Sequence, residues 1–267
     1  MPPLVLDISV KDTLGPFALT RRLPSCRIGE RFVALHQVSL TSHVVYRFNS
    51  GIDGRDALAA LEAACVLQHR HILKIEHFDL DKSGRPFCVT PFTGDRDGLL
   101  SLTRLLRAKS GIMRLAEAKH AADQLLAAIA YAHMQRAWHG PMMMDEVLID
   151  RHGALHVELY GVANTLGHPE NDPAEQQRRE VQTAMGMLYQ LITGLRYEEP
   201  FIRPGRVIAG LHRSWDDFFE TGLSEPGFAS GAHARSALLA CRTEPTGRML
   251  SPTRLRAAMQ RAMWAGQ

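Results

Sequence analysis

The sequence lacks several features that would assign it to a special class of protein. No run of 18 apolar residues is present, and the first ten residues, MPPLVLDISV, contain no basic segment of the kind that begins a secretory signal. Neither sign of charge dominates, because 31 basic residues stand against 28 acidic ones. We therefore expect a soluble, cytoplasmic chain without the basic surface of a protein that binds nucleic acid or a membrane.

Cysteine is also scarce, and its positions form no motif. The four cysteines are Cys26, Cys65, Cys88 and Cys241, and their spacing matches neither a metal site nor a redox pair. Three of them lie in apolar surroundings, which favours reduced cysteines in a core over disulfides. We therefore predict that the chain has no metal site.

What the sequence does contain is enough apolar material for a large core. Hydrophobic residues make up 45% of its 267 residues, which suits one large domain or two closely packed lobes. Residues 14–48 alternate between apolar and polar side chains, so they predict three strands. Pro24, Gly29 and the pair Thr41–Ser42 are the expected breaks between them.

A helix and two more strands follow. Residues 53–68 predict an amphipathic helix that is capped by Asp53 or Asp56. Residues 72–76 and 86–92 predict two strands on either side of a DKSG turn. Together these segments predict a five-stranded antiparallel sheet with one helix.

Residues 120–163 combine a helix, a loop and two short strands in one order. Apolar residues at helical spacing predict a helix that is closed by Trp138 and His139. Two apolar runs, residues 147–150 and 155–159, then predict a tight hairpin.

This order resembles the protein kinase family, in particular bacterial serine/threonine kinases, where a helix ending in His leads into the catalytic loop HRDLKPEN, a strand pair and the motif DFG. The alignment needs no gap. It places His139 on the motif's His, Gly140 on its Arg, Pro141 on the catalytic Asp, Met143 on the Lys, Glu146 on the metal-binding Asn, and Leu159, Tyr160 and Gly161 on DFG. The resemblance implies an α+β, two-lobed fold with a small lobe at residues 1–93 and a mainly helical large lobe at residues 94–267.

The resemblance extends over most of the large lobe. Residues 180–194 are similar to its buried central helix, with Glu180 on the family's Asp. Residues 203–267 predict further helices, and the last of these begins with Ser251 as its cap and Pro252 at its first position.

The small-lobe motifs of the family are largely replaced. Pro24 and Cys26 fall on the first two glycines of the phosphate loop, and only Gly29 matches the third. Arg47 falls on the family's ATP-binding Lys, which replaces a compact ammonium with a larger planar group. Ala60 falls on the Glu that should pair with that Lys, so that an Arg47–Glu62 pair would need a shift in register.

Two hydrophobic columns of the kinase fold fare differently in the alignment. The column that supports both lobes would comprise Ala64, Ile75, His139 and Tyr160, all of which can pack. The second column is completed by adenine in kinases, and its positions fall on Val45, Arg31 and Leu148. A charge at Arg31 and extra bulk at Val45 predict that adenine is poorly accommodated.

The aligned residues cannot supply kinase chemistry in the usual way. Kinases hold magnesium with the DFG Asp and the loop Asn and orient the substrate hydroxyl with the HRD Asp. Neither Pro141 nor Leu159 has a side-chain oxygen or nitrogen. The resemblance therefore implies a pseudokinase that is not an enzyme, has no catalytic residue, needs no cofactor and does not bind ATP with magnesium. Arg47, Glu146 and Glu158 remain as possible nucleotide or metal contacts, although Glu146 could be a solvated loop residue and Glu158 an outward strand residue.

Two functions stay open at this point. We expect a protein-binding, scaffolding or regulatory module in signalling, whose surface is formed by residues 140–145 and 164–180. Met142, Met143 and Met144 could supply adaptable apolar contact there, or they could pack on the core. The alternative is an enzyme with an altered nucleotide site that performs atypical phosphoryl or nucleotidyl transfer.

Overall fold

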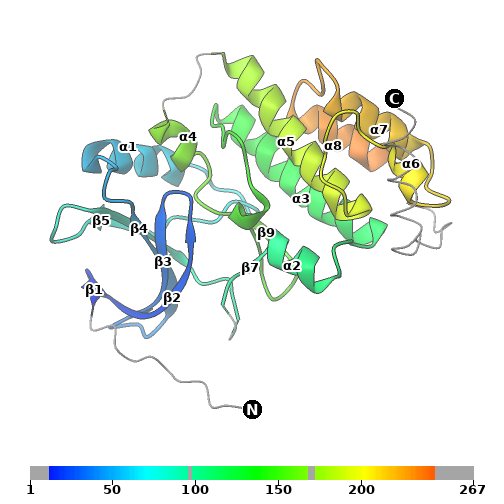
Figure 1. The fold of residues 1–267 in the computed structure, drawn as a ribbon. Helices are drawn as coiled ribbons and strands as arrows, with labels where there is room; N and C mark the ends of the chain where they lie inside the picture. Colours follow the sequence, from blue (N-terminus) through cyan, green and yellow to red (C-terminus); the bar gives the residue numbers. More distant parts are fainter. Residues whose placement is uncertain (1–11, 96–97, 168–171, 244–267) are drawn as a thin grey trace, which may run out of the picture. The chain divides into compact units, whose positions relative to one another are not determined.

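The computed structural model describes residues 12–95, 98–167 and 172–243. The chain divides into two compact units, Met1–Leu102 with Ala137–Asn171, and Thr103–Arg136 with Asp172–Gln267. The aligned catalytic loop and DFG positions therefore belong to the same unit as the sheet (Figure 1). None of the helices in the described ranges has the length and apolar character needed to cross a membrane.

The first unit contains an antiparallel sheet of six strands in the order β1-β2-β3-β4-β6-β5. The three strands predicted between residues 14 and 48 are confirmed, and a two-residue strand is added at the edge. The strands are β1 (Thr13–Leu14), β2 (Phe17–Cys26), β3 (Gly29–His36), β4 (Ser42–Phe48), β5 (His77–Leu80) and β6 (Pro86–Pro91).

Two details of the predicted sheet are wrong. The strand expected at residues 72–76 lies instead at His77–Leu80, because the apolar side chains of the predicted segment are buried in the core and only Ile72 makes a bridge, with Val157. Pro24 does not end β2, since it lies inside the strand at an interruption of the ladder between β2 and β3, where its missing N–H is tolerated.

Helix α1 (Gly54–Cys65) confirms the predicted helix and its cap. The Asp53 carboxylate accepts hydrogen bonds from the backbone N–H groups of Arg55 and Asp56, which satisfies two of the free donors at the helix start. The helix buries Ala57, Ala60 and Leu61.

A second, three-stranded antiparallel sheet carries the aligned catalytic segment. It consists of β7 (Leu100–Ser101), β8 (Val147–Ile149) and β9 (Leu155–Val157), so the predicted hairpin is confirmed. The short 3₁₀ helix η1 (Met144–Glu146) precedes β8, and helix α4 (Val162–Leu166) follows β9 and packs against α1.

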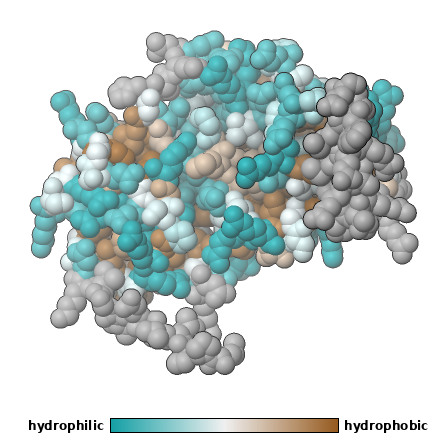
Figure 2. Space-filling model, in the orientation of Figure 1, coloured by the Kyte–Doolittle hydropathy of each residue, from teal (hydrophilic) through white to brown (hydrophobic). Residues whose placement is uncertain are grey.

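The second unit is helical. Its elements are α2 (Leu102–Ala108), α3 (Leu115–Met134), α5 (Pro173–Thr193), α6 (Pro204–Val207), α7 (Ser214–Leu223) and α8 (Gly231–Ala240). Helix α3 packs against α5 and α8. The face in Figure 2 shows hydrophobic residues in patches that are interrupted by hydrophilic side chains.

Two helix boundaries differ from the prediction. Helix α5 begins at Pro173 and not at Glu180, because Asp172 caps it and Glu175 pairs with Arg178 and Arg179 along its first turns. Helix α3 ends at Met134, before the predicted end at residues 138–139. The predicted final helix from Ser251 lies outside the described residues.

Candidate functional site

Most of the aligned kinase positions gather where the sheet of the first unit meets the segment that contains the catalytic loop. His139 is buried and its ring lies 5.2 Å from the ring of Tyr160 in an edge-to-face contact. Ile75 is buried in the same hydrophobic cluster as Leu159 and Leu148, and Ala64 packs against that cluster. The side chains predicted to support the fold therefore lie in packed positions.

The register of β4 corrects the roles given to Arg47 and Val45. Val44, Tyr46 and Phe48 belong to the cluster that contains Leu159, whereas Val45 belongs to a separate cluster. Because side chains alternate along a strand, Arg47 points to the side opposite Tyr46. The alignment was shifted by one residue at this strand, and such a shift exchanges the two faces.

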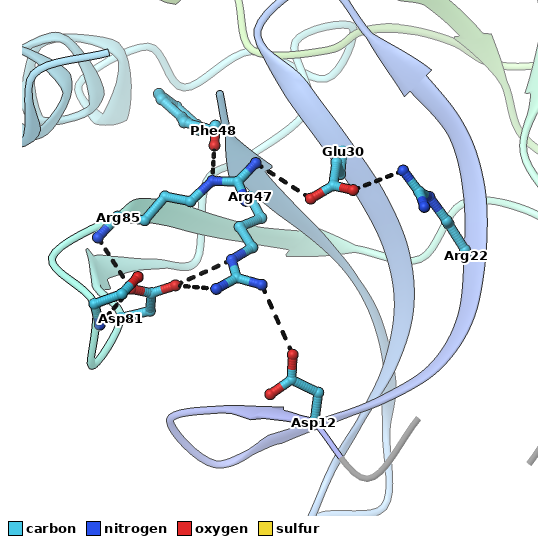
Figure 3. Close-up of polar contacts among 8 residues, drawn as sticks. Asp12, Arg22, Glu30, Arg47, Phe48, Asp81 and Arg85 are labelled. Carbon is cyan, nitrogen blue, oxygen red and sulfur yellow. Dashed lines mark hydrogen bonds and ion pairs between the residues drawn. The ribbon is translucent and has the colours of Figure 1, made fainter. Parts of the chain in front are cut away.

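Arg47 belongs to a polar network on the sheet and not to a nucleotide contact (Figure 3). Its guanidinium lies 2.6 Å from the Asp81 carboxylate and 3.7 Å from Asp12. The predicted pair with Glu62 is not formed, because Glu62 is exposed on α1.

Asp81 organises the turn that Arg47 reaches. Burial alone would raise the pKa of Asp81, but hydrogen bonds from Ser83, from the Arg85 backbone and from Arg47 lower this pKa to about 2. Arg85 continues the network, since it donates to the carbonyl oxygen of Phe48 and pairs with Glu30 (Figure 3). The charge of Arg47 therefore stabilises the sheet.

The residue that faces the aligned catalytic segment is Tyr46, and it meets a buried ion pair. Arg31 Nη1 lies 2.9 and 3.0 Å from the two carboxylate oxygens of Glu158, and the Tyr46 hydroxyl donates to Glu158 at 2.9 Å. Arg31 Nε also donates to the Pro24 carbonyl oxygen at 2.7 Å. All three side chains are buried, so the predictions of an outward Glu158 and of a free metal ligand there are wrong.

The electrostatics of this cluster follow from its burial. Loss of solvent raises the pKa of Glu158, and the positive charge of Arg31 with the hydrogen bond from Tyr46 opposes that rise. Burial and the neighbouring Glu158 carboxylate raise the pKa of Tyr46 well above its ordinary value. Tyr46 therefore remains a neutral hydrogen-bond donor at neutral pH.

Glu146, at the position of the metal-binding Asn, is also held by protein groups. One carboxylate oxygen accepts the Met143 backbone N–H at 2.8 Å, and the other lies 3.2 Å from Arg27 Nε. Arg27 also donates to the Pro141 carbonyl oxygen at 3.2 Å. Glu146 is buried, so the prediction of a solvated loop carboxylate is corrected.

The remaining phosphate-loop positions form a tight turn between β2 and β3. Cys26 pairs with Gly29 across that turn, and its thiol donates to the Gly29 carbonyl oxygen at 3.4 Å. A Cβ at Gly29 would lie 2.1 Å from the carbonyl oxygen of Arg47. Glycine is thus required here for the close approach of β3 to β4.

The DFG positions pack into the unit. Leu159 has φ +46 and is buried, a left-handed conformation that is uncommon for a leucine. Gly161, with φ +80, precedes α4 and makes the turn into it. Gly140 also has a positive φ, and a Cβ there would lie 2.8 Å from the Asn164 side chain.

The space left among these groups is small. A cavity of about 10 Å³ is lined by Cys26, Arg27, Ile28, His139, Glu146, Glu158, Leu159 and Ala163. Such a volume suits about one water molecule, whereas sites for drug-sized ligands take roughly 300–1,000 Å³. In the described ranges no group of three or more His, Cys, Asp or Glu side chains is arranged to hold a metal ion.

The three methionines differ in exposure. Met142 is buried, Met144 is partly buried and Met143 is 47% exposed. The predicted methionine patch is therefore reduced to Met143 as its main exposed member.

The sequence patterns did not indicate Arg27 or Tyr46 as residues of the site. The stronger apolar character of Val44, Tyr46 and Phe48 was a signal for the correct face of β4. No local pattern marked Arg27, because its partners lie more than a hundred residues along the chain.

Protein kinases are the known proteins that the chain resembles in sequence and in structure. No protein-family model matches the sequence. Cyclin-dependent kinase 2 of Caenorhabditis elegans is 25% identical over 168 residues, which cover 61% of this chain and 44% of that protein, so the match spans less than half of its length.

Solved structures agree on the fold. The kinase domain of Mycobacterium tuberculosis PknI matches with a TM-score of 0.68 and 14% identity over 86% of this chain and 98% of that domain. A double mutant of the same domain matches over the same shares with a TM-score of 0.71 and 14% identity.

These comparisons correct one prediction and confirm another. The prediction that the chain is not an enzyme is wrong, because the proteins it resembles in sequence and in structure are kinases. The fold class is confirmed, since an antiparallel sheet with one main helix and a helical lobe match the kinase structures. The chain has the two-lobed α+β fold of a protein kinase.

Proposed function

We propose that this chain is a regulatory, protein-binding module built on the protein kinase fold, and that residues 140–145 form its binding surface. The observation that carries the proposal is the buried cluster of Arg31, Glu158 and Tyr46. In this cluster Arg31, at a position that the family alignment gives to adenine, is bound by protein side chains.

The metal positions support the same proposal. Magnesium in kinases neutralises phosphate charge and is held by acidic and amide side chains. Here the two nearby carboxylates, Glu146 and Glu158, each have an arginine partner. A cation at either carboxylate would have to displace a guanidinium. We therefore propose that ATP with magnesium is not bound in the manner of kinases.

The surface proposal is limited to residues 140–145, which lie in the first unit. The second predicted segment, residues 164–180, runs through residues that are not described and into the other unit. Within 140–145, the thioether of Met143 is flexible and polarisable, so it can adapt to a partner's apolar surface.

The test is to isolate a partner from the native host with the full chain as bait and then to measure its affinity for a Met143→Ser variant. Hot-spot residues cost about 2 kcal/mol or more when truncated. The matched control is Met134→Ser, because Met134 is 73% exposed at the end of α3 and lies outside residues 140–145. Unchanged affinity in a folded Met143→Ser variant would reject this surface.

Nucleotide binding is tested by melting the chain with and without ATP and magnesium. A ligand at 100 times its dissociation constant stabilises a protein by about 2.7 kcal/mol, which raises the melting temperature clearly. We expect no rise with millimolar ATP and magnesium. A clear rise would contradict the proposal, and a rise without metal would favour the second function below.

The kinase neighbours favour a second candidate function, phosphoryl or nucleotidyl transfer with an altered site. Glu146 and Glu158 would then be the carboxylates near the transferred group, and Arg31 on β3 would supply the positive charge that the alignment assigned to Arg47. Incorporation of label from ATP into the chain or a general protein substrate would support this function. Glu158→Gln should abolish that incorporation if Glu158 takes part.

A further inference from the structure

The tip of the β2–β3 hairpin is tied directly to the proposed binding surface. Arg27 lies in the turn between the two strands and reaches the loop at two points. Its Nε lies 3.2 Å from a Glu146 oxygen, and its Nη1 donates to the Pro141 carbonyl oxygen at 3.2 Å. One planar guanidinium thus holds both ends of the segment 141–146.

Glu146 transmits this contact to Met143. Its other carboxylate oxygen accepts the Met143 N–H at 2.8 Å, and its own N–H donates to the Met143 carbonyl oxygen at 2.9 Å. The carboxylate is therefore bound on both oxygens, one by an arginine and one by the backbone of the most exposed residue in the methionine triplet. Because Glu146 is buried, loss of Arg27 would leave a desolvated carboxylate without its positive partner.

A second arginine on the same hairpin provides a contrast. Arg22 pairs with Glu30 on the neighbouring strand, and its side chain is largely exposed. Neither partner belongs to the loop. Removal of Arg22 should therefore leave residues 141–146 unaffected, while it changes the charge of the hairpin by the same amount as removal of Arg27.

We propose that Arg27 is the positioning residue of the binding surface. Its contacts with Pro141 and Glu146 would fix the conformation of residues 141–146 in the unbound chain. The effect of Arg27 on partner affinity rests on the proposed function, whereas its effect on the conformation of residues 141–146 does not. A loop that is already ordered loses less conformational entropy on association, which strengthens binding without a new contact. A change that displaces the hairpin tip would then lower the affinity of the surface for its partner.

Hydrogen exchange on the full chain tests the mechanics without a partner. In Arg27→Gln the backbone amides of Met143 and Glu146 should exchange about tenfold faster, which corresponds to roughly 1.4 kcal/mol of lost protection. In the matched control Arg22→Gln they should exchange at the wild-type rate. If both amides of folded Arg27→Gln exchange at the wild-type rate, Arg27 does not position residues 141–146.

A second set of variants distinguishes local loosening of residues 141–146 from a general loss of stability. Glu146→Gln should loosen the same amides, and the double variant Arg27→Gln with Glu146→Gln should add little further, because residues that act through one contact are not additive. Amides of β6 should keep their exchange rates in all three. Full additivity, or equal loosening of β6, would show that Arg27 acts elsewhere.

The partner measurement separates this inference from the proposed function. Arg27→Gln should lower the affinity for the isolated partner about tenfold, mostly through faster dissociation. A loosened loop with unchanged affinity would overturn the role of Arg27 in binding. A normal affinity of Met143→Ser would instead reject the proposed surface while the exchange result still stood.

Discussion

The Tyr46 hydroxyl donates to Glu158 across 112 positions of sequence, at a distance of 2.9 Å and with both side chains buried. It shares that carboxylate with Arg31, so a neutral donor and a cation together compensate one desolvated charge. This contact joins β4 to the residue before the DFG positions and decides which face of the strand is central to the site.

Removal of the Tyr46 hydroxyl should weaken the fold measurably. Tyr46→Phe leaves Glu158 with Arg31 alone, and hydrogen bonds to charged groups contribute about 1.5–3 kcal/mol. We expect a loss of that size in urea unfolding. Tyr197→Phe is the control, because the Tyr197 side chain is only partly buried and its hydroxyl contacts Glu199 and the Leu223 carbonyl oxygen without a buried ion pair. An equal, small effect of both changes would contradict the importance of the buried bond.

Removal of the Arg31 side chain should destabilise the fold more than removal of the Tyr46 hydroxyl. Arg31→Met leaves Glu158 buried and unpaired, and breaking a buried ion pair typically costs about 3–5 kcal/mol. The double variant Arg31→Met with Glu158→Leu should recover much of the stability, since neither charge is then left alone. Chemical unfolding of the three variants measures this, and a double variant weaker than Arg31→Met would count against the pairing.

The pH dependence of Arg31→Met has a definite sign. Burial already raises the pKa of Glu158, and removal of Arg31 takes away the positive charge that opposes this rise, so this pKa should rise further. A carboxylate with a raised folded pKa stabilises the fold below its unfolded pKa, near 4.5, and this contribution is lost as pH rises through the folded value. The deficit of Arg31→Met relative to wild type should therefore be larger at pH 8 than at pH 5.

Asp81 should show the opposite dependence. Its folded pKa of about 2 lies below the ordinary 3.8, so its contribution is present above pH 3.8 and is lost as pH falls towards 2. Asp81→Asn should destabilise the fold by roughly 1–2 kcal/mol at pH 6. Unfolding experiments should find that the difference from wild type shrinks between pH 4 and pH 2, and a constant difference would refute this account.

Gly29 offers a steric test with a matched control. In Gly29→Ala the new Cβ would lie 2.1 Å from a backbone oxygen of β4, so the strands must separate. We expect a loss of about 1–3 kcal/mol, the usual cost of overpacking. Gly51→Ala meets nothing within 4 Å and should change the melting temperature little. Similar melting temperatures for both variants would show that β3 can move at no cost.

Local signals predicted local structure well. The cap at Asp53, the hairpin of β8 and β9 and the three strands before residue 49 follow from residues that are neighbours in sequence. The kinase fold followed from the order of these elements. Helix α5 was predicted too short, because its first two turns are polar and are held by a cap and ion pairs.

The site was harder to predict because its contacts are long-range. Arg31 and Glu158 are 127 positions apart, and no spacing rule relates them. An error of one residue in the alignment of β4 then exchanged Arg47 for Tyr46, since each step along a strand reverses the face. The alignment predicted neither the ion pair of Arg31 and Glu158 nor the Tyr46 hydroxyl that completes it.

The exposed and the buried ion pairs of the first unit should respond differently to dissolved salt. Ions shield charges that water reaches, and the Debye length is only about 3 Å at 1 M salt. The exposed pair of Arg22 and Glu30 should lose most of its attraction there, whereas the enclosed pair of Arg31 and Glu158 is shielded much less. The buried cluster of Arg31, Glu158 and Tyr46 should consequently persist in concentrated salt, even where the exposed ion pairs of the sheet no longer contribute.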